Sequence, residues 1–328
     1  MSKLVLHIGT HKTATTTIQN TFAANSGLLA QHGVIYPRFS RVTGHHGLVP
    51  NWPRMPRPYH LPGGSLETLA KIASHHADSD DTVFLSSEEF SRIRHLAEIG
   101  RIRDAFAEFD RVEVVCVLRT QWQFLQSVYL QISKKSSPPH PPLFVQPVIE
   151  SGMCHGLWVD YNGILDALEP HFAGDEITFL DFDACRKAEG GIVGSFLRHL
   201  GLPIGADALV QVNGGMSNVS PLSLASWAAN LIAEPKAAPS WLIKKTTKAL
   251  RVEFGEDIRP CLFSREEFAA LKDHFSICNA RLEQRRAAVQ PGFALQPADA
   301  KGLKPFRDDI LGSYWLRCAQ WIAVDHLT

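Results

Sequence analysis

Short apolar runs alternate with longer amphipathic segments over the first 200 residues, and this alternation constrains the fold most strongly. The apolar runs lie at residues 3–8, 33–36, 82–86, 111–118 and 177–180. Runs of this length and composition are typical of central strands that are buried on both faces. The segments between them have helical spacing, at residues 15–31, 66–76, 90–109, 122–134, 161–172 and 192–200. We therefore expect an α/β three-layer sandwich around a mostly parallel sheet.

The remaining segments fall into irregular and helical parts. Residues 37–60 are rich in Pro, Gly, His and Arg and read as a loop or an insertion. Residues 136–147 are Pro-rich, so we expect no regular structure there, and a wall or lid over a ligand site. After residue 220 the pattern is mainly helical, and Ser264-Arg-Glu-Glu267 fits a capping box that opens a helix to about Arg286. We expect one domain over residues 1–328, with a core of about 1–205 and a helical portion of about 220–328 packed on it.

Composition excludes several classes of protein. Hydrophobic residues make up 45% of the chain, and 33 Lys and Arg balance 33 Asp and Glu, so neither a disordered chain nor a nucleic-acid binder is expected. The six cysteines are dispersed without a C-x-x-C pair, which is typical of reduced thiols. The N-terminus lacks a signal-peptide pattern, and no apolar run reaches the about 20 residues of a membrane span. We expect a cytoplasmic protein whose oligomeric state the sequence does not indicate.

The loop Gly9–Thr17 joins the first predicted strand to the first predicted helix. Such a loop exposes unpaired N–H groups at the positive end of a helix dipole, which is a favourable site for phosphate or sulfate. Lys12 adds a positive charge, and the loop and helix start add hydroxyl groups at Thr13, Thr15, Thr16 and Thr17. The nucleoside-triphosphate P-loop needs Gly-x-x-x-x-Gly-Lys-Ser/Thr. Counted from Gly9, the second glycine of this pattern would fall at Ala14 and its lysine at Thr15, so the segment does not match the P-loop pattern.

This segment, His7-Ile-Gly-Thr-His-Lys-Thr-Ala-Thr-Thr-Thr-Ile-Gln19, resembles the 5′-phosphosulfate loop of another family. That family is the sulfotransferases that use 3′-phosphoadenosine 5′-phosphosulfate (PAPS), bacterial-type members included. The resemblance implies a P-loop-like fold and a donor site formed by His11, Lys12, Thr13, Ala14, Thr15, Thr16 and Thr17. Ala14 stands where the family has glycine. If that position requires a positive φ, alanine costs ~1 kcal/mol.

A second anchor follows the strand at residues 111–118. The resemblance implies that Arg119, at the strand end, and Ser127, eight residues later, bind the donor's 3′-phosphate. Arginine offers planar, bidentate recognition of phosphate, and serine adds a neutral donor. Gln121 replaces the family's usual proline. A polar segment at residues 213–218 matches the region where family members close the nucleotide pocket.

The resemblance also implies a transfer reaction that needs no metal and leaves adenosine 3′,5′-bisphosphate (PAP) as product. Lys12 and the loop N–H groups would offset the charge that develops on the leaving phosphate. Ser86-Ser-Glu-Glu-Phe90 follows a strand and places Glu88 at the carboxyl edge of the sheet, where α/β folds bind ligands. We expect Glu88 to be the general base, with Glu89 as second choice and His46 as a rival. Helix capping is the alternative role for both glutamates.

Acceptor and reaction class remain open at this point. The acceptor would be a hydroxyl or amine of a glycan, lipid or small molecule, and Trp52 and Trp122 are candidates to stack against it. A P-loop nucleotide kinase is the main rival, because residues 177–181 read as a strand ending in an Asp181 that could hold magnesium. A catalytically inactive nucleotide-binding module is the other.

Overall fold

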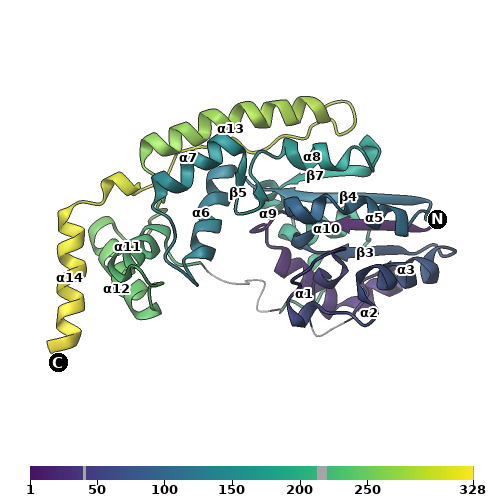
Figure 1. Ribbon diagram of the computed structural model, residues 1–328, viewed down its shortest axis with the longest axis horizontal. Coiled ribbons are helices and arrows are strands. Elements are labelled where there is room, and N and C mark those ends of the chain that lie inside the picture. Colours follow the sequence, from purple (N-terminus) through teal and green to yellow (C-terminus); the bar gives the residue numbers. More distant parts are fainter. Residues whose placement is uncertain (40–41, 213–219, 328) are drawn as a thin grey trace. The chain divides into compact units, whose positions relative to one another are not determined.

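The computed structural model describes residues 1–39, 42–212 and 220–327 of the chain (Figure 1). They form two compact units. The first comprises Met1–Arg119, Met153–Ser217 and Cys278–Gln296, and the second comprises Thr120–Gly152, Asn218–Ile277 and Pro297–Thr328. The single domain expected from the sequence stays a prediction.

The first unit is built on a five-stranded sheet in the order β2-β3-β1-β4-β7, and every neighbouring pair is parallel. The strands are β1 (Lys3–His7), β2 (Val34–Ile35), β3 (Thr82–Ser86), β4 (Arg111–Leu118) and β7 (Ile177–Asp181). A separate antiparallel pair is formed by β5 (Met153–Cys154) and β6 (Leu157–Trp158). The α/β prediction with a mostly parallel sheet is confirmed, and all five predicted strands exist.

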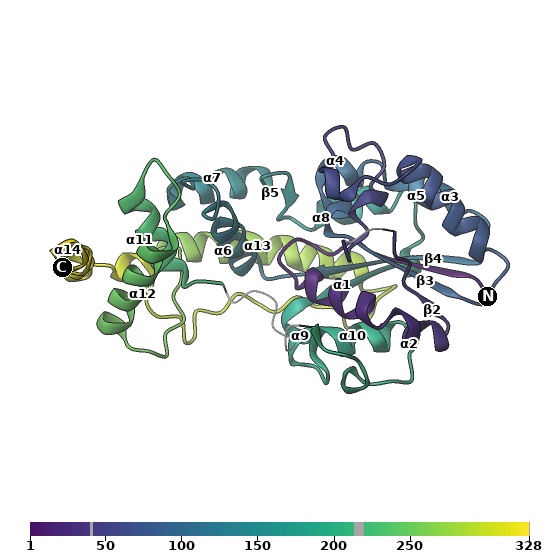
Figure 2. The ribbon, with the colours of Figure 1, turned by 90° about the horizontal axis from the view of Figure 1, so that it is seen from below.

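Strand periodicity divides the buried residues into two cores. In β1, Leu4 and Leu6 enter one core, while Val5 enters the other. Helices cover both faces of the sheet (Figure 2). One face carries α1 (Thr15–Ala24), α2 (Ser26–Gln31), α9 (Phe182–Lys187) and α10 (Gly191–His199). The other carries α3 (Gly64–His76), α4 (Ile93–Leu96), α5 (Ile99–Ala105) and α8 (Asn162–Leu168). This arrangement is the predicted three-layer sandwich.

Two predicted helices are interrupted. The helix expected at residues 15–31 breaks at Asn25, whose side-chain amide donates to Thr21 O at 2.8 Å and accepts from Val210 N at 2.9 Å. These bonds offer the backbone an alternative to continued helix. The helical pattern at residues 90–109 forms short pieces, the 3-10 helix η3 (Glu88–Ser91) followed by α4 and α5. Arg92 is extended between η3 and α4, with a ψ of 139°.

The second unit is helical. Its helices are α6 (Gln121–Ile132), α7 (Pro141–Ser151), α11 (Ser223–Ala233), α12 (Ser240–Phe254), α14 (Gly312–Leu327) and the first part of α13 (Arg265–Arg286). The capping box is confirmed, because Glu267 N donates to Ser264 Oγ at 3.1 Å and Ser264 N donates to Glu267 Oε2 at 2.9 Å. No helix in the described ranges is long and apolar enough to cross a bilayer.

The expectation of irregular structure throughout residues 136–147 is wrong. α7 begins at Pro141, and its prolines occupy the first helical positions, where the missing N–H has no helical partner to lose. Pro147 lies inside the helix, which nevertheless continues to Ser151. Five of the six cysteines are buried, as expected, and Cys278 is half-buried.

Candidate functional site

The loop after β1 holds an unusual backbone. Gly9, Lys12 and Ala14 have φ values of 56°, 68° and 59°. The positive φ considered for Ala14 is therefore present, and Lys12 is strained in the same way. Left-handed residues within such a turn direct successive N–H groups to one side and form an anion-binding nest. Strain of this kind persists where the surrounding structure holds it, often at ligand sites.

Hydrogen bonds to β4 hold the loop in place. Ile8 N donates to Val115 O at 2.9 Å, and Thr10 N donates to Val117 O at 3.0 Å. The Thr10 hydroxyl donates to the same carbonyl at 3.0 Å. Further along, Thr13 Oγ1 donates to Thr10 O at 2.5 Å, so Thr13 is used within the loop. These hydrogen bonds within the chain hold the backbone of the loop.

Thr15 begins α1 and has a buried hydroxyl that points to a ligand. Its side chain is 4% exposed, and Oγ1 has no hydrogen-bond partner among the described residues. A buried hydroxyl without a partner calls for an explanation such as an absent ion or water. Its position at a helix N-terminus favours an anion. Of the other predicted donor residues, Thr16 is exposed, while His11, Lys12 and Thr17 are half-buried.

Glu88 lies directly against this loop. A Cβ added at Gly9 would sit 3.1 Å from Thr15 Oγ1 and 3.5 Å from Glu88 Cβ, so a side chain there would crowd the Thr15 hydroxyl and touch Glu88. Glu88 Oε2 accepts a hydrogen bond from Gln19 Nε2 at 3.1 Å. The cap of η3 is Ser87, whose Oγ accepts from Glu89 N at 3.2 Å. Capping therefore does not account for the Glu88 carboxylate.

Glu89 has a different environment. Its carboxylate lies 2.9 Å from Arg92 Nε, 3.6 Å from His95 Nδ1 and 3.9 Å from His11 Nε2. Burial raises the pKa of Glu89, and Arg92 opposes that shift. Burial, followed by the charge of Arg92, lowers the pKa of His11 to about 3, so His11 is neutral at pH 7. These contacts occupy the Glu89 carboxylate, whereas the Glu88 carboxylate accepts a hydrogen bond from Gln19.

The adjacent histidines are both buried rather than solvated. His46 Nδ1 lies 2.7 Å from Ser87 Oγ and 4.0 Å from Glu88 Oε2, and its ring centroid is 4.7 Å from that of Tyr59. His45 is structural, because its Nδ1 accepts from Ser86 N at 2.9 Å and its Nε2 therefore donates to Pro37 O at 2.7 Å. Burial lowers the pKa of His45 to about 4.

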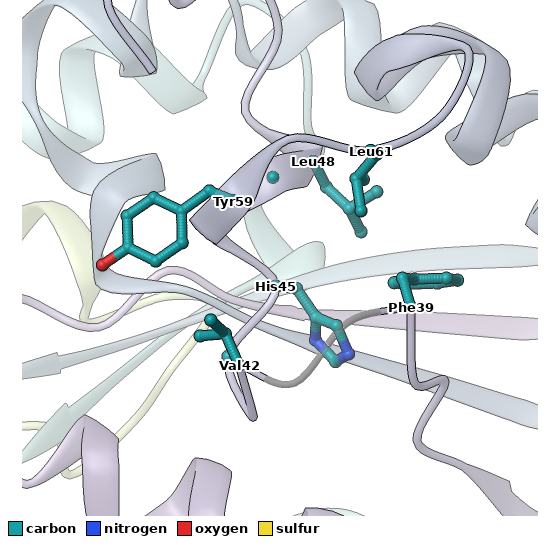
Figure 3. A pocket seen from close by; sticks show the side chains of 8 residues that line it. Phe39, Val42, His45, Leu48, Tyr59 and Leu61 are labelled. Atoms are coloured by element: carbon teal, nitrogen blue, oxygen red, sulfur yellow. The ribbon is translucent and has the colours of Figure 1, made fainter. Parts of the chain in front are cut away.

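A narrow pocket lies beside His45 (Figure 3). It is lined by Phe39, Val42, Gly44, His45, Gly47, Leu48, Tyr59 and Leu61. Its water-accessible space is about 10 Å³, enough for one water molecule and not for an acceptor. The Tyr59 hydroxyl points away from His45 in this view (Figure 3).

Arg119 reaches the same edge of the sheet. Its Nη1 donates to Lys12 O at 3.1 Å, and its guanidinium carbon lies 5.0 Å from the Phe182 ring centroid. Tyr161 donates its hydroxyl hydrogen to Arg119 O at 2.5 Å. Burial lowers the pKa of Arg119 to about 10, so it remains a cation at neutral pH. Ser127 lies on α6 in the second unit, and its pairing with Arg119 stays a prediction.

Asp181 acts as a helix cap in this structure. Its Oδ1 accepts from Ala184 N at 2.7 Å, and its Oδ2 accepts from Gln296 N at 3.1 Å. Burial raises the pKa of this carboxyl. Capping thus explains the residue that the kinase alternative would assign to magnesium. In the described part of the chain, no three His, Cys, Asp or Glu side chains are grouped to hold a metal ion.

Sequence reasoning missed two residues beside Glu88, namely Gln19 and Tyr59. Gln19 could have been found as a polar residue on the apolar side of a predicted helix, whereas Tyr59 gave no signal within the irregular insertion. Trp52 lies near the site, 5.9 Å from Tyr59, while Trp122 packs against Phe268 within the second unit. The predicted pocket-closing segment at residues 213–218 lies outside the described residues.

Comparison with known proteins gives only distant likenesses. No family model and no curated protein sequence matches the chain. A sulfotransferase from Alicyclobacillus acidocaldarius aligns with a TM-score of 0.38 and 13% identity, over 70% of this chain and 92% of its own. A sulfotransferase domain from the curacin biosynthetic pathway aligns with a TM-score of 0.39 and 10% identity, over 84% of this chain and 98% of its own.

Proposed function

We propose that the chain is a sulfotransferase, which moves the sulfuryl group of PAPS to an acceptor hydroxyl or amine. The observation that carries this proposal is the loop after β1. Lys12 and Ala14 are left-handed, the buried Thr15 hydroxyl has no partner within the described ranges, and Glu88 packs against the loop. A group transfer needs a site that binds the anionic donor and a base that takes the acceptor's proton. The anion nest would serve as the first and the carboxylate beside it as the second.

Two cations would bind the donor. The nest and Lys12 face the phosphosulfate, and Lys12 offsets the charge that develops on the leaving phosphate. Arg119, fixed through Lys12 O and Phe182, would bind the 3′-phosphate together with Ser127. Because Arg119 donates to Lys12 O, a shift of the loop that would bind the phosphosulfate would also move the arginine that would bind the 3′-phosphate.

Glu88 would act as the base. It accepts the acceptor's proton as the acceptor oxygen or nitrogen bonds to sulfur. The bond between sulfur and the bridging oxygen of the 5′-phosphate breaks, and adenosine 3′,5′-bisphosphate leaves with that electron pair. The 3.1 Å bond from Gln19 holds one carboxylate oxygen, and the 4.0 Å distance from His46 Nδ1 to Glu88 Oε2 supports a role for His46 as a partner of Glu88 in this proposal.

Calorimetric titration tests donor binding. We expect adenosine 3′,5′-bisphosphate to bind at least about tenfold more tightly than ATP. In Lys12→Met, the affinity for the bisphosphate should fall by about tenfold or more relative to the unmodified chain, a loss of about 1.4 kcal/mol. Lys71→Met, an exposed lysine on α3, is the control and should change nothing. Equal affinity for ATP, or an unaffected Lys12→Met, would contradict the proposal.

Turnover of labelled PAPS tests the base. Glu88→Gln should keep the bisphosphate affinity and lose turnover by at least about a hundredfold, because general bases contribute that much or more. An inactive nucleotide-binding module would show no turnover in the unmodified chain either. A kinase would transfer phosphate from ATP and would depend on magnesium.

A further inference from the structure

The acidic and basic residues are unevenly distributed along the chain. The first Asp or Glu is Glu67, so residues 1–66 contain none, while they contain six Lys and Arg. The rest of the chain then has 33 − 6 = 27 Lys and Arg against 33 Asp and Glu. The acid-free stretch forms the phosphate loop, α1 and the insertion that reaches Glu88. A chain of zero net charge therefore builds its candidate site from its most basic part.

A continuous row of aromatic rings leads from Glu88 to Arg94. His46 lies 4.0 Å from Glu88 Oε2, and its ring centroid is 4.7 Å from that of Tyr59. Trp52 follows at 5.9 Å from Tyr59. The guanidinium of Arg94 lies 6.0 Å from the Trp52 ring centroid. Burial, and then the charges of Glu88 and Glu89, raises the pKa of Tyr59, so the phenol lies in the field of both carboxylates.

Three arginines along this row are exposed and carry uncompensated charge. Arg54 and Arg57 lie two residues from Trp52 and Tyr59, and Arg94 contacts Trp52 directly. Within the described residues, no carboxylate is within ion-pairing distance of Arg54, Arg57 or Arg94. Arg92, by contrast, is paired with Glu89 at 2.9 Å. Residues 52–59 and 88–95 together contain four arginines and two glutamates, a net charge of +2.

We infer that the acceptor is an anion, a ring-bearing molecule with a carboxylate, phosphate or sulfate near the hydroxyl or amine that is sulfated. This inference rests on the proposed function and names its substrate class. The aromatic row offers surface to a sugar or aryl ring, and the arginines bind the acidic group. Glu88 then meets the reacting hydroxyl at the inner end of the row.

A matched pair of probes tests the inference. 4-Nitrophenyl β-D-glucuronide and 4-nitrophenyl β-D-glucoside differ only in the carboxylate at C6. We expect labelled PAPS to sulfate the glucuronide with a kcat/KM at least about tenfold higher, the gain of one charge-assisted contact. Binding of each probe with adenosine 3′,5′-bisphosphate in place should show the same order. Raising the salt concentration should reduce the preference, because the arginines are exposed.

Variants locate the effect. The double variant Arg57→Ala, Arg94→Ala should reduce the preference to about twofold by weakening the glucuronide alone. Arg101→Ala removes an exposed arginine of α5 that pairs with Glu98 at 3.4 Å, and it should leave the preference unchanged. The preference is a ratio measured within one variant, so a general loss of folded protein lowers both rates and leaves the ratio unchanged.

Several results would overturn the inference. These are an equal or higher rate with the glucoside, an equal loss of both probes in the double variant, or binding of neither probe. The bisphosphate titration is run on every variant. If the nucleotide binds and the charge preference is missing, the acceptor inference alone fails. If the nucleotide does not bind, the proposed function itself fails.

Discussion

Gln19 connects the helix that follows the phosphate loop to the carboxylate that faces it. Its Nε2 donates to Glu88 Oε2 at 3.1 Å and lies 3.3 Å from Ser86 O. A Cβ at Gly44 would fall 2.6 Å from the Gln19 side chain, so the amide is held from the other side as well. An amide held in this way fixes the position of one oxygen of Glu88, the carboxylate that we propose as the base.

Replacing Gln19 by leucine removes that donor with little change in volume. A hydrogen bond to a charged group contributes roughly 1.5–3 kcal/mol, so we expect kcat/KM to fall by about tenfold to a hundredfold. The affinity for adenosine 3′,5′-bisphosphate should remain, since Gln19 does not face the nest. Gln31→Leu, on exposed surface of α2, is the matched control. A loss of nucleotide affinity in Gln19→Leu would mean that the residue supports the loop instead.

Ala14 offers a test of the strained loop. At a φ of 59°, alanine costs about 1 kcal/mol that glycine would not, although glycine gains entropy in the unfolded chain. Ala14→Gly should therefore leave the free energy of unfolding unchanged or raise it by up to about 1 kcal/mol. Ala30→Gly, in the exposed face of α2, should lower it by about 1 kcal/mol. Urea denaturation measures both. A clear loss in Ala14→Gly would refute the strain argument.

The sequence allowed the loop and Glu88 to be predicted because each is a local pattern at a strand end. Each apolar run predicts a strand and shows which residues follow its carboxyl end. In a parallel sheet the carboxyl ends of all the strands lie at the same edge. Gln19 and Tyr59 were not predicted, because their roles depend on partners that are distant in sequence. His45 and His46 show the same limit, since only the fold separates the structural histidine from the one beside Glu88.

At the scale of elements, the insertion at residues 37–60 depends on a close backbone approach. A Cβ at Gly47 would fall 2.2 Å from Tyr59 O and 2.9 Å from the Leu61 side chain. Gly47→Ala therefore forces η1 (His46–Leu48) and η2 (Arg57–Tyr59) apart. We expect acceptor kcat/KM to fall by more than about tenfold while nucleotide affinity persists, because a 1 Å displacement can cost a hundredfold.

The control for that variant is Gly27→Ala, since a Cβ at Gly27 meets nothing within 4 Å. It should leave both readouts unchanged. Loss of nucleotide binding in Gly47→Ala would show that the insertion also supports the phosphate loop.

Regular elements were predictable where hydrophobic periodicity and caps agree, as in β4 and in α13 with its Ser264 box. Regular structure was missed at residues 136–147, where the prediction considered only the prolines. The prolines of residues 136–147 were read as breakers, yet at the first turn of α7 they cost no hydrogen bond. The pattern at residues 90–109 lacked a signal for the extended Arg92, which is held in place by Glu89.

At the scale of the whole molecule, buried histidines make stability depend on pH. His7 and His45 are 0% and 4% exposed, and burial lowers their pKa values to about 3 and about 4. Both are neutral in the folded protein at pH 7. Below the ordinary value of about 6.5, the unfolded chain takes up protons that the folded chain refuses. Stability is therefore fully present above about pH 6.5 and falls as the pH drops toward 4.

Each such histidine contributes a slope that approaches about 1.4 kcal/mol per pH unit where the unfolded side chain is protonated and the folded one is neutral. His7→Asn removes one titrating group while keeping a polar side chain near Ser86 Oγ, which His7 Nδ1 approaches at 2.9 Å. Urea denaturation at pH 5, 6 and 7 should show a lower stability at pH 7, because packing against Phe196 is lost, but a slope smaller by about 1 kcal/mol per unit on average over this range. His32→Asn, at an exposed position, should keep the original slope. An unchanged slope in His7→Asn would show that the proton uptake of acid unfolding occurs at other groups.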